Sequence, residues 1–176
     1  MIDYHMLSQA LHEYEQRGYT LLDASWTTSE DAIYATLPDN CVPIYVNPWP
    51  SERNCLVGSA EQSLIEMQLP EGRYCAVTPC FRDEHTLNDL TQSYFMKIEL
   101  FARTTNPYEA NRLIRDAEKV MGMFTVKPIL REQVYSGIDL LIDGIEVGSY
   151  GIRWHKEYGS WVYGTGLALP RFSKVK

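Results

Sequence analysis

The sequence predicts an α+β protein with a mainly antiparallel sheet flanked by helices. Strand-like segments follow one another closely, and short turns such as Asp143–Gly144 and Tyr158–Ser160 join the last of them into hairpins. Helical patterns lie between or outside these blocks of strands, which favours adjacent hairpins over a doubly wound parallel sheet. With 176 residues and no internal repeat or linker, the chain is expected to form one domain over residues 1–176.

The elements can be assigned in chain order. Apolar residues recur at helical spacing near the N-terminus and Gly18 follows them, which predicts a helix from about 3 to 17. Ser59 lies at the cap position of a second helical pattern over 59–69. Residues 27–40 are turn-rich and ambiguous. Strand patterns occur at 18–25, 41–47, 73–81, 93–103, 137–142, 144–154 and 160–169.

The clearest helix spans 106–122, where Asn106 is the expected cap and Gly122 the expected end. We expect the hairpin of 73–81 and 93–103 to lie at the centre of the sheet, with the helices packed on one face.

Composition excludes several classes of function. The net charge of −7 argues against tight, unspecific binding along a nucleic-acid backbone. No apolar stretch reaches membrane-spanning length and the N-terminus is not a signal peptide, so we expect a cytoplasmic protein with no membrane partner. The cysteines show no CxxC spacing and are expected to be reduced and mostly buried: Cys41, Cys55, Cys75 and Cys80.

Charged residues lie inside segments that otherwise indicate buried strands. The carboxylates of Asp139 and Glu146 can lie side by side across a hairpin, and two hard oxygen ligands with open positions suit Mg²⁺ carrying a nucleoside triphosphate. Arginines near such a pair suit bidentate binding of phosphate or carboxylate groups. The charges concerned are Arg82, Glu84, Lys97, Glu99, Asp139, Glu146, Arg153 and Arg171. The alternative is that each arginine only pairs with a neighbouring acid.

Four elements resemble the class II aminoacyl-tRNA synthetases, in family order. "CFRDE" followed by "YFMKIELF" resembles motif 2, and "GTGLALPRF" resembles motif 3. "DLLIDGIEVGSYGIR" is similar to the stretch before motif 3 in the aspartyl, asparaginyl and lysyl branch and in ammonia-dependent asparagine synthetase. "GSAEQSL" lies where the family has an element that contacts the amino acid.

The resemblance implies ATP and Mg²⁺ as cofactors. Arg82 would bind the α-phosphate and the substrate carboxylate, and Arg171 would bind the γ-phosphate, which makes these two the implied catalytic residues. Glu84 would bind the adenine amino group and Phe95 would stack on the ring. Asp139 and Glu146 would carry the Mg²⁺.

The resemblance also implies a substrate site that binds an amino acid or another small carboxylate. Ser59 and Glu61 would contact the amino group, and Glu99 belongs to the same substrate-binding set. Arg153 would hold a side-chain carboxylate, which favours aspartate. Arg153 lies seven residues after Glu146, so a regular strand would place the two on opposite faces unless "GSYG" bends or bulges. The alternative is that Arg153 pairs with an acid on the far face.

The chain also departs from the family pattern. Ser25 lies where motif 1 has a Pro at the dimer interface, so the sequence does not decide whether the chain forms a homodimer. Ala168 and Pro170 differ from motif 3 of the aspartyl branch, and only five residues follow Arg171, so we do not expect the motif 3 helix to form. No anticodon-binding domain is expected, and we do not expect the chain to charge tRNA.

Two functions fit these patterns. The first is a minimal adenylate-forming ligase that activates a carboxylate with ATP. The second is a catalytically silent synthetase paralogue that acts as a ligand-sensing or regulatory binding module. The retained charged residues favour the enzyme, and the altered motif 3 favours the module.

Overall fold

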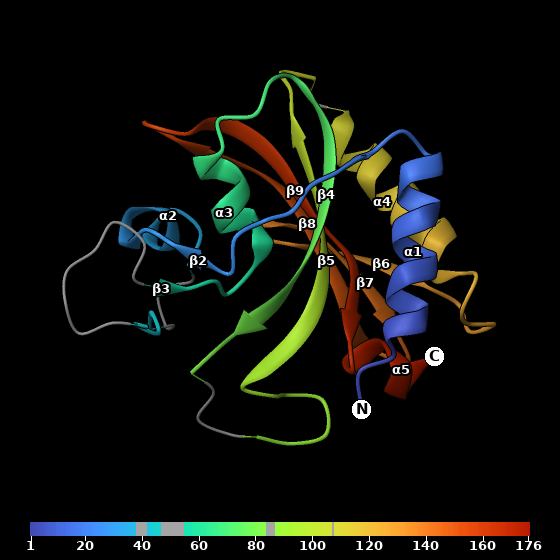
Figure 1. The fold of residues 1–176 in the computed structure, drawn as a ribbon. Helices are drawn as coiled ribbons and strands as arrows, with labels where there is room; N and C mark the ends of the chain where they lie inside the picture. Colours follow the sequence, from blue (N-terminus) through green and yellow to red (C-terminus); the bar gives the residue numbers. More distant parts are fainter. Residues whose placement is uncertain (38–41, 47–54, 84–86, 107) are drawn as a thin grey trace.

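The computed structural model describes residues 1–37, 42–46, 55–83, 87–106 and 108–176, and its centre is a seven-stranded sheet of order β1-β4-β5-β9-β8-β7-β6 (Figure 1). All neighbouring strands pair antiparallel except β1, which pairs parallel with β4. The strands are β1 (Thr20–Leu21), β4 (Gly72–Phe81), β5 (Tyr94–Arg103), β6 (Leu130–Val134), β7 (Gly137–Ile142), β8 (Ile145–His155) and β9 (Gly159–Leu169). The α+β prediction with a mainly antiparallel sheet is confirmed.

Helices cover both faces of this sheet. Figure 1 shows α1 and α4 on one side of the strands and α3 on the other. A two-stranded antiparallel pair, β2 (Thr27–Thr28) and β3 (Cys55–Leu56), lies near α3. The helices are α1 (Tyr4–Gln16), α2 (Glu30–Tyr34), α3 (Ala60–Glu66), α4 (Glu109–Met121) and α5 (Arg171–Val175). No helix in the described part of the chain is long and apolar enough to cross a membrane.

Two expectations about the sheet were wrong. The helices were expected on one face, but apolar residues of β4, β5 and β9 alternate between two cores, and each core needs its own cover. The hairpin of β4 and β5 was expected at the centre, but β9 occupies the middle position because β5 pairs with it on its second edge.

Most long elements lie where the sequence predicts them, and the differences are local. Within the predicted strand at 41–47, the described residues form only an isolated bridge from Tyr45 to Cys55. Asn106 was expected to be the N-cap of α4, but the N-cap is Tyr108 and the helix begins at Glu109. The Asn106 side chain accepts from the Tyr108 amide at 3.0 Å. No helix was expected after motif 3, but the short helix α5 is present there. Burial of Phe172 and Val175 stabilises it.

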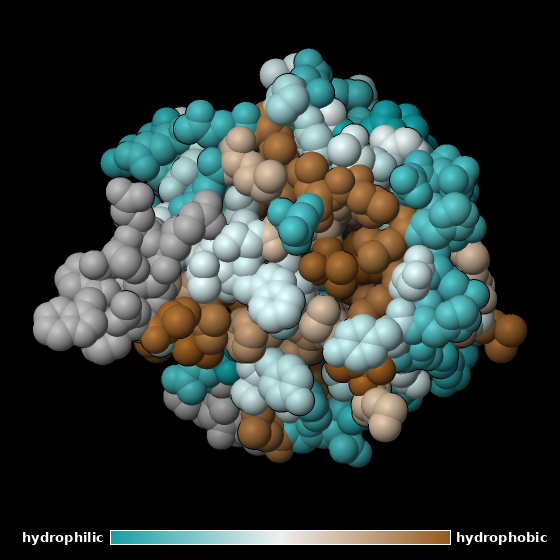
Figure 2. Space-filling model, in the orientation of Figure 1, coloured by the Kyte–Doolittle hydropathy of each residue, from teal (hydrophilic) through white to brown (hydrophobic). Residues whose placement is uncertain are grey.

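The larger core lies between the sheet and helices α1, α4 and α5. Side chains of β5 such as Ile98 and Leu100 are fully buried against it. In Figure 2, hydrophilic side chains follow the outer side of α1, and apolar side chains gather between α1 and the sheet. Burial also raises the pKa of Cys75 to about 12 and that of Cys80 to about 11, so both remain neutral thiols.

Two irregularities in the ladder change which residues face which side. Leu140 pairs with Gly148 but Leu141 pairs with Glu146, so Val147 is an extra residue in β8. Likewise Ile98 pairs with Leu167 while Glu99 pairs with Thr165, so β9 carries an extra residue at Gly166. Both shifts lie beside the charged residues that the sequence singled out.

Tyr14 of α1 forms a hydrogen bond with the extra residue of β9, Gly166. Its hydroxyl is fully buried and donates to the Gly166 carbonyl at 2.9 Å. We expect Tyr14→Phe to lower the free energy of unfolding by about 1–3 kcal/mol, because a buried acceptor loses its donor. Tyr4→Phe on the same helix, where the side chain is exposed, is the matched control and should change little. Urea denaturation of both variants measures the difference, and equal effects would contradict the assignment.

Candidate functional site

Most charged strand residues that the sequence singled out lie on the face of the sheet that α3 covers. In β5, Phe95, Lys97 and Glu99 alternate with the residues of the larger core. Glu99 pairs with Thr165 of β9, and Asp139 of β7 pairs with Ser149 of β8. The face that α3 covers therefore carries a polar site beside the smaller of the two apolar cores.

The start of α3 is fixed by a capping box. Ser59 is the N-cap, and its hydroxyl accepts from the Glu61 amide at 3.3 Å. The Gln62 side chain accepts from the amides of Gly58 and Ser59 at 2.7 and 3.3 Å. This arrangement holds Ser59 and Glu61, both predicted substrate-binding residues, in defined positions over the sheet.

A pocket opens beside β5 and the end of β9. It brings together four residues predicted to bind a nucleotide: Arg82, Phe95, Glu146 and Arg171. Lys97, Ser149 and Thr165 also line it. Its charged lining is Arg82, Lys97 and Arg171 against the carboxylate of Glu146, so the pocket is positive although the chain carries a net charge of −7. This distribution suits an anionic ligand.

The loop between β4 and β5 forms one wall of the pocket through Leu90, Thr91 and Gln92. Asn88 shapes this loop, because its side chain accepts from the amides of Leu90 and Thr91 at 2.7 and 2.9 Å. Helix α5 then ties the loop down: Arg171 Nε donates to the Leu90 carbonyl at 3.2 Å, and Lys174 donates to the Asp89 carbonyl.

Both arginines that line the pocket contact other predicted site residues. The Arg82 guanidinium lies over the Phe95 ring, 5.1 Å from its centroid, so a cation and an aromatic face share one wall. Arg171 Nη1 donates to the Glu146 carbonyl at 3.4 Å and lies 3.9 Å from its carboxylate.

Glu61 is the centre of a second cluster next to the pocket. Its side chain is buried, and its two oxygens accept from Trp161 Nε1 at 2.6 Å and from Arg153 Nη1. The Arg153 guanidinium also lies over the Tyr163 ring, 4.1 Å from its centroid. Burial lowers the pKa of Arg153, but the Glu61 carboxylate outweighs this and leaves the pKa raised. The pair is a charged, hydrogen-bonded unit.

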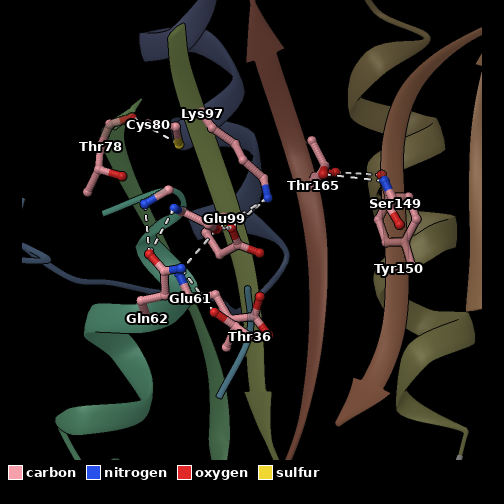
Figure 3. Close-up of polar contacts among 12 residues, drawn as sticks. Thr36, Glu61, Gln62, Thr78, Cys80, Lys97, Glu99, Ser149, Tyr150 and Thr165 are labelled. Atoms are coloured by element: carbon pink, nitrogen blue, oxygen red, sulfur yellow. Dashed lines mark hydrogen bonds and ion pairs between the residues drawn. The ribbon is translucent and has the colours of Figure 1, made fainter. Parts of the chain in front are cut away.

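Lys97 and Glu99 form a third contact. Figure 3 shows the Lys97 side chain extending along β5 so that its amino group lies beside Glu99. Lys97 Nζ is 2.7 Å from Glu99 Oε2 and 3.3 Å from Ser59 Oγ, and the Ser59 hydroxyl donates to the same Glu99 oxygen. Burial would lower the pKa of Lys97, but Glu99 raises it, so the amine is charged at neutral pH.

The predicted metal pair is arranged differently from expectation. Asp139 and Glu146 were expected side by side across the hairpin, but Asp139 pairs with Ser149 and Glu146 pairs with Leu141. The extra residue Val147 causes this shift. The two acids still share one face, at diagonal positions. Glu84 lies outside the described residues.

A bulge brings Glu146 and Arg153 to one face, but it lies at Val147, just before the "GSYG" where it was expected. Ser149 pairs with Asp139, and Arg153 pairs with Trp161 on the same side of β8, so Glu146 and Arg153 lie on one face. Arg153 does pair with an acid, as the alternative expected, but that acid is Glu61 on the site face. Whether these residues bind a ligand stays a prediction.

Sequence reasoning missed the contacts of three site residues. Lys97 was noted as a charge inside a strand, but no role was assigned to it. Trp161 and the Tyr163 ring contact Glu61 and Arg153, although the aromatic residues were expected only to pack. The signal that could have found Trp161 is its strand position opposite Arg153.

With this arrangement in view, comparison with solved structures defines the class of fold. The fold is that of the catalytic core of class II aminoacyl-tRNA synthetases, since synthetases of this class superimpose on nearly the whole chain. No family model and no curated protein matches the sequence.

The similar structures include a pyrrolysyl-tRNA synthetase and two seryl enzymes. PylSc of Desulfitobacterium hafniense has a TM-score of 0.76 at 16% identity, covering 98% of this chain and 68% of its own. Seryl-tRNA synthetase of Pyrococcus horikoshii, complexed with ATP, has a TM-score of 0.74 at 18% identity, and the match covers 98% of this chain and 49% of that enzyme. The cytoplasmic serine-tRNA ligase of Naegleria fowleri, in complex with AMP, has a TM-score of 0.73 at 15% identity, and the match covers 94% of this chain and 51% of that enzyme. The chain therefore spans about half the length of the seryl enzymes.

The Glu61–Arg153 pair can be tested by a double-mutant cycle. Arg153→Leu should lower the free energy of unfolding by about 2–4 kcal/mol, because it leaves the Glu61 charge buried without its cation. Glu61→Gln added to Arg153→Leu should recover more than half of that loss, since the buried charge is then removed. Urea denaturation followed by Trp fluorescence measures both. A double variant no more stable than Arg153→Leu would contradict the pairing.

Proposed function

We propose that the protein binds ATP with Mg²⁺ and activates a small carboxylate as an adenylate, which is a ligase-type reaction. The observation that carries this proposal is the pocket in which Arg82, Phe95 and Arg171 meet on a class II synthetase fold. One structurally similar enzyme is described as complexed with ATP and another with AMP, which supports a nucleotide as the ligand.

In this reaction an oxygen of the substrate carboxylate attacks the α-phosphorus of ATP. The bond from the α-phosphorus to the bridging oxygen breaks, and pyrophosphate leaves with that electron pair. Arg82 and Arg171 neutralise the phosphate charge, so catalysis comes mainly from positioning and electrostatic stabilisation. Phe95 and Glu84 would hold the adenine. No general base is needed, because the attacking carboxylate is already ionised.

The residues present fit a hard divalent cation. Asp139 Oδ1 is buried and has no hydrogen-bond partner among the described residues, and the Glu146 carboxylate lines the pocket on the same face. No group of three or more potential ligands occurs in the described part of the chain, so phosphate oxygens and water would complete the coordination. A bound Mg²⁺ would shield the charge of the phosphates.

The substrate is proposed here only as a carboxylate. The aspartate hypothesis required Arg153 on the site face, where the structure places it. However, Arg153 is held by Glu61, so an acidic substrate would have to compete with a buried ion pair. We therefore do not extend the proposal to aspartate.

The ATP site can be tested by thermal unfolding. Millimolar ATP with Mg²⁺ should raise the melting temperature, because a ligand selective for the native state stabilises it by about 2.7 kcal/mol at one hundred times its dissociation constant. Arg82→Ala should remove most of the shift without unfolding the ligand-free protein. Arg115→Ala is the matched control, since this arginine is exposed on α4, across the sheet from the site.

Three outcomes of this experiment are distinguishable. A shift accompanied by carboxylate-dependent exchange of pyrophosphate into ATP supports the ligase. A shift with no exchange for any carboxylate supports the binding module. No shift at all contradicts the proposal that the pocket binds a nucleotide.

The cation site predicts a dependence on Glu146. Glu146→Gln should raise the Mg²⁺ concentration needed for half of the ATP-induced shift by about tenfold, because a hard cation loses one charged oxygen ligand. Glu15→Gln, an exposed acid of α1 on the other side of the sheet, is the control. A Mg²⁺ titration unchanged in the Glu146 variant would show that this carboxylate does not serve the cation.

A further inference from the structure

The residues expected to bind the ammonium group of an amino acid already have cationic partners from the protein itself. The resemblance assigned Ser59, Glu61 and Glu99 to the substrate. Glu61 accepts from Arg153 and from Trp161, so both of its oxygens are engaged. Ser59 and Glu99 both contact the Lys97 ammonium group.

Lys97 supplies the cation that Glu99 and Ser59 contact. Its Nζ lies 2.7 Å from Glu99 Oε2 and 3.3 Å from Ser59 Oγ (Figure 3). Only 12% of the Lys97 side chain is exposed and none of Glu99, so the ion pair is enclosed. Because Lys97 also lines the pocket next to Arg82, the group that this end presents to a ligand is a cation.

We propose that Lys97 is a built-in replacement for the substrate ammonium, so that the substrate is a carboxylic acid with no ammonium group beside its carboxylate. This inference rests on the proposed function and names its substrate class. The Lys97 ammonium group then faces an anionic group of the ligand, and the substrate carboxylate is the anion that adenylate formation requires at this end of the pocket.

The charges around the site oppose an additional ammonium group. It would share Glu99 with Lys97 at a separation of a few ångströms, and like charges that close in an enclosed site repel strongly. The other nearby acid, Glu61, is neutralised by Arg153. The four charges of Lys97, Glu99, Glu61 and Arg153 therefore sum to zero before any ligand enters.

One acceptor is left over. Glu99 Oε1 is buried and has no hydrogen-bond partner among the described residues. A neutral donor suits it, because a neutral group adds no charge beside Lys97. Glu99 has no exposed side-chain surface and is not among the residues that line the pocket, so this acceptor does not decide between 2-hydroxy acids and unsubstituted acids.

The first test uses the unaltered protein and matched acids. With saturating ATP and Mg²⁺, pyrophosphate exchange and thermal shift are measured for sets that differ only at carbon 2, such as alanine, lactate and propionate, or phenylalanine, 3-phenyllactate and 3-phenylpropionate. The hydroxy or unsubstituted member should act at least about tenfold better than the amino member in every active set. Amino acids that act better than both partners would overturn the inference.

The second test needs no knowledge of the substrate. Lys97→Ala leaves Glu99 without its cation, so its melting temperature should fall, and ethylammonium should raise it again. The same ethylammonium should not stabilise the unaltered protein or the double variant Lys97→Ala with Glu99→Gln. If Lys97→Ala does not fold, its refolding yield with and without ethylammonium is compared instead. Equal effects of ethylammonium on all three proteins, or a Lys97→Ala variant as stable as the original, would overturn the inference.

These outcomes separate the inference from the function on which it rests. Absence of any ATP-induced shift contradicts the proposed function, while ethylammonium rescue is measured without nucleotide. Exchange that depends on amino acids supports the proposed function and overturns only the role given to Lys97.

Discussion

Strand β5 is the constraint on which the rest of the structure depends, because it pairs along both edges and is buried on both faces. Alternation sends Ile98 and Leu100 into the larger core and sends Lys97 and Glu99 to the side of α3. The charges of Lys97 and Glu99 are tolerated there because they neutralise each other and contact Ser59, the capping serine of α3. The fold and the polar site therefore share one segment of ten residues.

The sequence was sufficient for elements with strong periodicity and insufficient where tertiary contacts decide. Helix α4 and the hairpins of β7, β8 and β9 carry clear patterns, and the turn at Asp143–Gly144 has the positive φ angles that Asp and Gly tolerate. Strand β6 was missed because its side chains are mostly exposed and show no alternation. Helix α5 was missed because its stability comes from burying Phe172 and Val175, not from its own short sequence.

The candidate site shows the same division. That Arg82, Phe95, Glu146 and Arg171 meet in one pocket was implied by the resemblance to the class II synthetases. The pairing of Asp139 with Ser149 could not be predicted, because one inserted residue at Val147 shifts the register. Nor could the partner of Arg153, since Glu61 is distant in sequence and only the packing of α3 on the sheet brings them together.

The contacts between α5 and the loop after β4 couple the last residues of the described chain to the pocket wall. Arg171 and Lys174 donate to consecutive carbonyls of that loop, Leu90 and Asp89. A substitution that unwinds α5, such as Phe172→Ala, would therefore release this wall of the pocket without changing any residue of the loop.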